Sequence, residues 1–99
     1  MQLVRYSILL TDEDLKVLYK IFDENHEAVG NIILQSSESD EILTSIILFR
    51  EIEINSLGQF LELAKMDFEG VKAITKKKNP STLSELLKES VIRLPPRQH

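Results

Sequence analysis

The sequence predicts an α+β sandwich with four strands and two helices in the order βαββαβ, followed by one further helix. Three observations support this order. Short β-branched runs alternate apolar and polar positions, the segments between them repeat apolar residues at helical spacing, and polar turn residues separate the two kinds of segment. At 99 residues the chain has the length of one small domain.

The first half of the unit is expected to be a strand over residues 3–10 and a helix over residues 12–25. The strand is β-rich and has two fairly apolar faces. Thr11, three residues before Asp14, has the position of an N-cap hydroxyl. The apolar residues that then recur at i, i+3 and i+7 are Leu15, Leu18 and Phe22.

The two middle strands are expected over residues 28–36 and 42–54, joined by a solvated turn at residues 36–40. Both are short of charge in their central parts and rich in isoleucine and leucine. In the 42–54 segment the odd-numbered and the even-numbered positions both carry large apolar residues. Both faces of this strand should therefore be covered by other groups.

The second half continues with a helix over residues 56–66, which a Ser-x-x-Gln capping-box spacing opens, and a strand over residues 67–76. We expect residues 1–78 to form one unit, residues 79–93 an appended helix and residues 94–99 a mobile tail. With a four-stranded antiparallel sheet, this is the split βαβ arrangement of the ferredoxin-like fold.

One face of such a sheet is covered by the helices, and large apolar residues are left on the other. Burying each of them is worth about 1.5 to 3 kcal/mol, so something should cover them. Two covers remain open, the appended helix or a second copy of the chain in a homodimer. The residues expected at this contact are Leu9, Leu43, Ile47, Phe49, Leu83 and Leu87.

The composition argues against several classes of function. A net charge of −4 repels nucleic acid and anionic membrane, and no apolar run is long enough to span a bilayer. Zero cysteines and two histidines leave little for nucleophilic or acid–base catalysis, so we expect neither an enzyme nor a cofactor or metal site. The absence of cysteine fits a cytoplasmic protein. An RNA-binding sheet, suggested by the basic run at residues 76–78, is the least favoured alternative.

Three stretches resemble an ACT-type regulatory domain, including the ACT-like C-terminal domains of MgtC-type membrane proteins. They are Leu10-Thr11-Asp12, Gly30-Asn31-Ile32-Ile33 and Gly70-Val71-Lys72-Ala73-Ile74. The resemblance implies a regulatory or sensory module that pairs with another copy and binds an amino acid or similar effector at Thr11, Asp12 and Asn31. It also implies that the module belongs to a larger protein. The alternative is a protein–protein assembly module without a small ligand.

Overall fold

The computed structural model describes residues 1–11, 14–37, 41–76 and 92–94. Within these ranges, four strands follow one another and precede one long helix, and a short fifth strand pairs with the sheet. The elements are β1 (Gln2–Leu10), β2 (Leu15–Phe22), β3 (Ala28–Ser36), β4 (Ile42–Leu48), α1 (Ile54–Lys76) and β5 (Ile92–Leu94).

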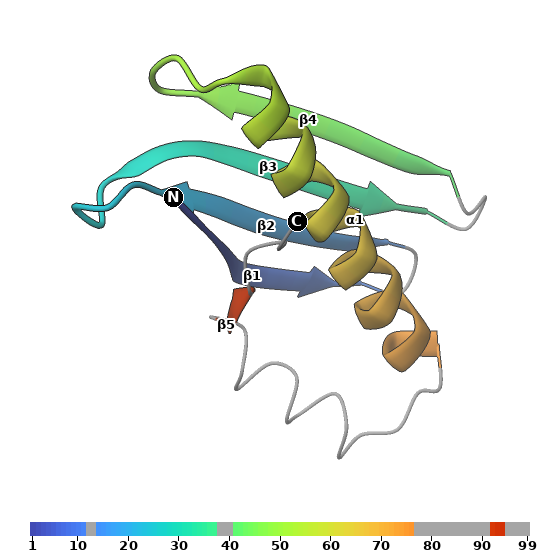
Figure 1. The fold of residues 1–99 in the computed structure, drawn as a ribbon. Coiled ribbons are helices and arrows are strands. Elements are labelled where there is room, and N and C mark those ends of the chain that lie inside the picture. The colour runs from blue at the N-terminus through green and yellow to red at the C-terminus, as the bar shows by residue number, and fades with distance from the viewer. Residues whose placement is uncertain (12–13, 38–40, 77–91, 95–99) are drawn as a thin grey trace.

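The strands form one five-stranded sheet in the order β4-β3-β2-β1-β5, and every neighbouring pair is antiparallel. The first four strands therefore form a meander, and α1 lies across one face of the sheet (Figure 1). The predicted βαββαβ, ferredoxin-like order is wrong for two reasons. No helix separates β1 from β2, and α1 occupies both the predicted second helix and the strand that was predicted to follow it.

The predicted helix over residues 12–25 is replaced by β2, the central strand of the meander. Its alternating residues Leu15, Val17, Tyr19 and Ile21 are at most 5% exposed, whereas Lys16 between them is exposed. The Thr11 hydroxyl does accept a hydrogen bond from the Asp14 amide at 3.0 Å, as an N-cap would, but here the bond closes the turn between β1 and β2.

The predicted strand over residues 67–76 is the second half of α1. Phe60, Ala64, Phe68 and Val71 lie on one side of the helix and are all buried, so a single apolar stripe runs through both halves. Gly70, within the predicted strand, lies on the exposed side of the helix, where a missing side chain costs no core packing. Within the described ranges, no helix is both long and apolar enough to span a membrane.

The predicted appended helix over residues 79–93 is also wrong at its end. Ile92 and Arg93 belong to β5, which pairs with β1 through Leu3, Val4 and Arg5. Residues 79–91 lie outside the described part of the chain. Of the predicted tail, Leu94 is the last residue of β5, and residues 95–99 lie outside the described part as well.

A β-bulge in β1 changes which residues face α1. The register between β1 and β2 shifts between Arg5 and Ser7, so Tyr6 is an extra residue. Leu3 therefore faces α1 and is 1% exposed, although simple alternation places it on the open face. Val4, which alternation places under the helices, lies opposite Lys20 on the open face.

A buried polar cluster joins α1 to the sheet. The Arg5 Nε atom lies 3.1 Å from the Asp67 Oδ2 atom of α1, and the Tyr19 hydroxyl donates a hydrogen bond to the same oxygen at 2.8 Å. Burial, reinforced by the negative charge of Asp67, raises the pKa of the Tyr19 hydroxyl far above its usual value. Tyr19 therefore stays neutral and acts as a donor that holds the helix over β1 and β2.

Candidate association surface

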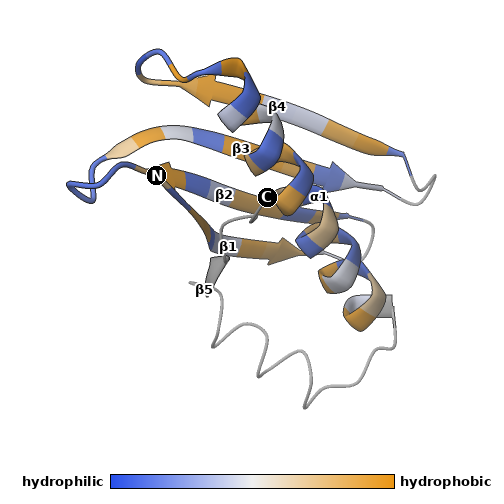
Figure 2. Cartoon of the chain, viewed as in Figure 1, coloured by the Kyte–Doolittle hydropathy of each residue, from blue (hydrophilic) through white to orange (hydrophobic). Residues whose placement is uncertain are grey.

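β4 is an edge strand of the sheet and is the most exposed of the strands β1 to β4. Its only strand neighbour among the described residues is β3. From Leu43 to Leu48 every residue is exposed, although most are large and apolar (Figure 2). The exposed fractions of its large side chains are 63% for Leu43, 39% for Ile46, 49% for Ile47 and 40% for Leu48.

The position of α1 explains this exposure. The helix packs over β1, β2 and β3, so the helix-side residues of β4 receive little cover. In register, Ile46 lies opposite Ile32 of β3, which is fully buried, yet Ile46 itself is exposed. β4 is therefore exposed on both of its faces as well as along its edge.

The backbone of β4 also presents free hydrogen-bonding groups. The Phe49 amide donates to the Val29 carbonyl at 2.9 Å, which makes this a hydrogen-bonded pair of the β3–β4 ladder. Because such pairs alternate with non-hydrogen-bonded ones, Leu43, Ser45 and Ile47 also direct their N–H and C=O groups toward β3. The corresponding groups of the intervening residues point away from the sheet. These residues are Ile42, Thr44, Ile46 and Leu48.

β4 lacks the features that normally protect a sheet edge from pairing. Its seven residues, ILTSIIL, include no lysine, no other charged residue and no proline. Its register with β3 runs without a shift, so no bulge turns the edge away, in contrast to the pairings of β1 with β2 and of β2 with β3.

The open face of the sheet is not a continuous apolar surface. Residues that face each other across the strands define rows on this face. One row is Leu9, Lys16, Gln35 and Leu43, and another is Val4, Lys20, Asn31 and Ile47. Both rows have polar residues on the central strands, and the Lys20 ammonium also lies 3.9 Å from the centre of the Tyr6 ring. Apart from Tyr6, Leu9 and Leu10 on β1, the large exposed apolar side chains of the described strands β1 to β4 are those of β4.

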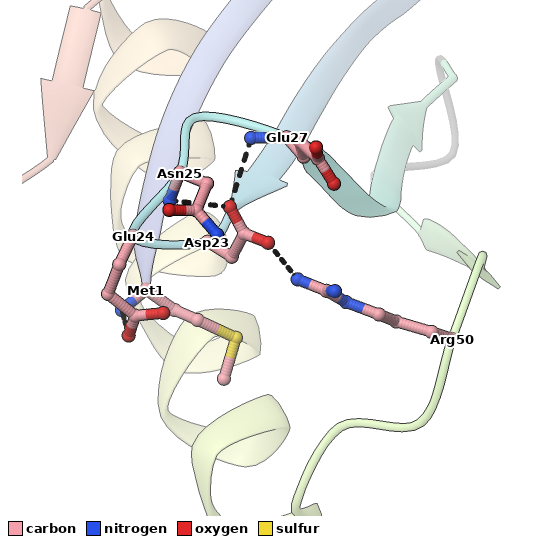
Figure 3. Close-up of polar contacts among 6 residues, drawn as sticks. All are labelled: Met1, Asp23, Glu24, Asn25, Glu27 and Arg50. Carbon is pink, nitrogen blue, oxygen red and sulfur yellow. Dashed lines mark hydrogen bonds and ion pairs between the residues drawn. The ribbon is translucent and has the colours of Figure 1, made fainter.

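A tight turn between β2 and β3 anchors the chain that leaves β4. Asp23 Oδ1 accepts hydrogen bonds from the amides of Asn25 and Glu27 at 2.8 and 3.0 Å, and Arg50 forms an ion pair with Asp23 Oδ2 (Figure 3). The bond from the Glu27 amide, followed by the one from Arg50, lowers the pKa of Asp23 below its ordinary value. Arg50 thus holds the segment that follows β4 against the turn between β2 and β3.

Close packing between β3 and β4 fixes the position of Leu48, the last residue of β4. A side chain at Gly30 of β3 would have its Cβ atom 2.9 Å from Leu48 Cδ2 and 3.1 Å from the Ile47 carbonyl oxygen. Gly30 therefore lets β4 and the following Ile52 approach β3 closely.

The predicted contact residues are only partly brought together. Leu43 and Ile47 lie on the open face of β4, and Phe49, 57% exposed, follows directly after the strand. Leu9 shares their face but lies on β1, three strand spacings or about 14 Å from β4. Leu83 and Leu87 lie outside the described residues. Ile46 and Leu48, on the helix side of β4, are exposed as well and were not among the predicted contact residues.

Of the predicted ligand residues, the two that the structure describes, Thr11 and Asn31, are not brought together. Thr11 lies in a hairpin turn beside Leu10 and Leu15, and not at a strand–helix corner. Asn31 lies on β3 opposite Lys20, five residues or about 17 Å along the sheet from that turn. Asp12 lies outside the described residues. Among the described residues no group of three histidine or acidic side chains is placed to hold a metal ion.

No protein-family model, no curated protein and no solved structure matches the chain. The surface that its own residues single out is the edge strand β4, whose apolar side chains and free backbone groups can form contacts with another polypeptide.

Proposed function

We propose that this chain is a non-enzymatic association module that self-associates through β4. One observation carries the proposal. Leu43, Ile46, Ile47 and Leu48 form an uncharged apolar strand that is exposed on both faces and along its edge. A soluble monomer gains nothing from this exposure, whereas an interface buries it.

The magnitude of the effect is sufficient for association. Full burial of a leucine or isoleucine contributes about 1.5 to 3 kcal/mol, and two such residues on each face of β4 are more than a third exposed. Association must overcome about 4 to 15 kcal/mol for lost translation and rotation, so several of these side chains must be buried together. A module of this kind fits the cytoplasmic location that the lack of cysteine favours.

The test is sedimentation equilibrium of the full chain over a range of concentrations. Wild type should show a concentration-dependent mass above that of the 11.4 kDa monomer. Ile47→Lys should remain at the monomer mass, because its side chain already points into solvent and the lysine charge would be buried only in the oligomer.

Ile54→Lys is the matched control. Ile54 is 79% exposed at the start of α1 and lies outside β4, so the same substitution there should leave association unchanged. A wild-type chain that stays monomeric at every concentration would contradict the proposal, as would equal association of wild type and Ile47→Lys.

A further inference from the structure

We propose that two copies of the chain pair β4 against β4 in antiparallel orientation, with Ser45 opposite Ser45 of the second copy. The two five-stranded sheets then form one continuous sheet around a two-fold axis. This inference rests on the proposed function, and specifies the hydrogen bonds and the register through which self-association occurs.

The direction of the backbone groups determines which residues can pair. Only Ile42, Thr44, Ile46 and Leu48 have N–H and C=O groups free at the edge, so hydrogen-bonded pairs across the contact must join members of this set. All four have side chains on the helix side of the sheet, and opposed residues in an antiparallel pair share a face. The two α1 helices must therefore lie on the same face of the joined sheet.

The length of β4 determines the register. With Ser45 at the centre, all seven residues of the strand are paired, and every free backbone group along the edge finds a partner. The hydrogen-bonded pairs join Thr44 with Ile46 of the second copy, and Ile42 with Leu48 of the second copy. A shift toward residue 44 places Glu41 opposite an isoleucine, and a shift toward residue 46 runs into the bend at residues 49–50.

The edge is also complementary to itself, which favours a second copy over an unrelated strand. In this register Leu43 faces Ile47 of the second copy on the open face, so the most exposed residues of β4 cover each other. The strand has no charge, so pairing with itself places no like charges opposite each other. The contact uses β4 of both copies, so neither copy keeps a free β4 edge for a third chain, and the assembly closes as a dimer.

Engineered disulfides test the register, because the chain has no cysteine of its own. Ser45 and its counterpart would form a non-hydrogen-bonded pair with Cα atoms about 4.5 Å apart, within the range that a disulfide spans. Ser45→Cys should therefore form a disulfide-linked dimer under mild oxidation. Leu43→Cys alone should not, since the two Leu43 positions lie four residues or about 13 Å apart in this register. The double variant Leu43→Cys/Ile47→Cys should cross-link. Ser7→Cys, exposed on β1, reports cross-linking by random collision.

Thr44→Pro tests the use of the edge itself. The Thr44 amide points away from β3, so proline removes no hydrogen bond of the monomer but removes an edge donor and obstructs pairing. Circular dichroism should show a folded chain and sedimentation a monomer.

The outcomes separate this inference from the proposed function. A dimeric wild type that Thr44→Pro leaves dimeric, or a Ser45→Cys variant that cross-links no better than Ser7→Cys, would overturn edge pairing while self-association stands. Efficient cross-linking of Leu43→Cys alone would overturn the register. A wild type that is monomeric at every concentration would overturn both proposals.

Discussion

The ion pair between Arg5 and Asp67 is a buried polar contact whose loss should destabilise the fold strongly. Arg5 is 6% exposed, and its Nε atom lies 3.1 Å from an Asp67 oxygen that also accepts the Tyr19 hydroxyl bond. Arg5→Met removes the positive charge and keeps most of the apolar stem. The Asp67 carboxylate of α1 would then remain largely buried between the helix and the sheet without a counter-charge.

The expected cost is about 3 kcal/mol. Removing one partner of a buried pair typically costs about 3 to 5 kcal/mol. The Asp67 side chain keeps 15% exposure and its bond from Tyr19, so the lower end of that range applies. Tyr19→Phe, which removes one hydrogen bond to a charged acceptor, should cost about 1.5 to 2 kcal/mol.

Urea unfolding at a fixed chain concentration, followed by circular dichroism, measures these free energies. The double variant Arg5→Met/Asp67→Leu serves as the control, because it leaves no unpaired charge and should recover at least half of the loss. A cost below about 1 kcal/mol for Arg5→Met, or a double variant no more stable than the single one, would refute the role assigned to the pair.

Three further changes test other parts of the structure. His26 has a φ of 62° in the β2–β3 turn, so His26→Gly should stabilise the fold by about 0.5 to 1 kcal/mol, and a lower melting temperature would contradict this. Gly30→Val should cost about 1 to 3 kcal/mol in urea unfolding, because its side chain meets Leu48 and the Ile47 carbonyl, and an unchanged midpoint would show that β4 moves freely. The pKa of Asp23 is lowered, so its contribution to stability is complete above pH 3.8 and is lost as the pH falls through the lowered value. The stability difference between wild type and Asp23→Asn should therefore shrink in acid, and a pH-independent difference would argue against the turn and the Arg50 contact as its source.

The sequence predicted the strands near β1, β3 and β4 but not β2. The segment from Leu15 to Phe22 carries apolar residues at both helical and alternating spacing, and the Thr11–Asp14 hydrogen bond suits both an N-cap and a hairpin turn. Local signals therefore left the choice open. Pairing with the neighbouring strands β1 and β3 on both sides, which the apolar spacing within the segment does not reveal, decides it in favour of a strand.

The length of α1 was missed for a related reason. The sequence predicts a helix that ends at residue 66 and a strand over residues 67–76, but the buried stripe from Phe60 to Val71 continues at helical spacing past Gly70. Packing of this stripe against the sheet outweighs the helix cost of one exposed glycine, about 1 kcal/mol.

The candidate site was predictable only in part. The alternation of the strand predicted that Leu43 and Ile47 lie on the face away from the helix, where both are exposed. The edge position of β4 follows from the strand order, which depends on β2 being a strand. The bulge at Tyr6, which moves Leu3 into the core, leaves no mark in the hydrophobic pattern.

Backbone amide hydrogen exchange of β4, measured by NMR as a function of chain concentration, tests the central claim most directly. The amides of Leu43, Ser45 and Ile47 bond to β3 and should be protected at every concentration. The amides of Thr44, Ile46 and Leu48 should exchange quickly in dilute solution and become protected as the chains associate. Exchange of these three amides that stays fast at concentrations where the mass is dimeric would contradict association through the edge of β4.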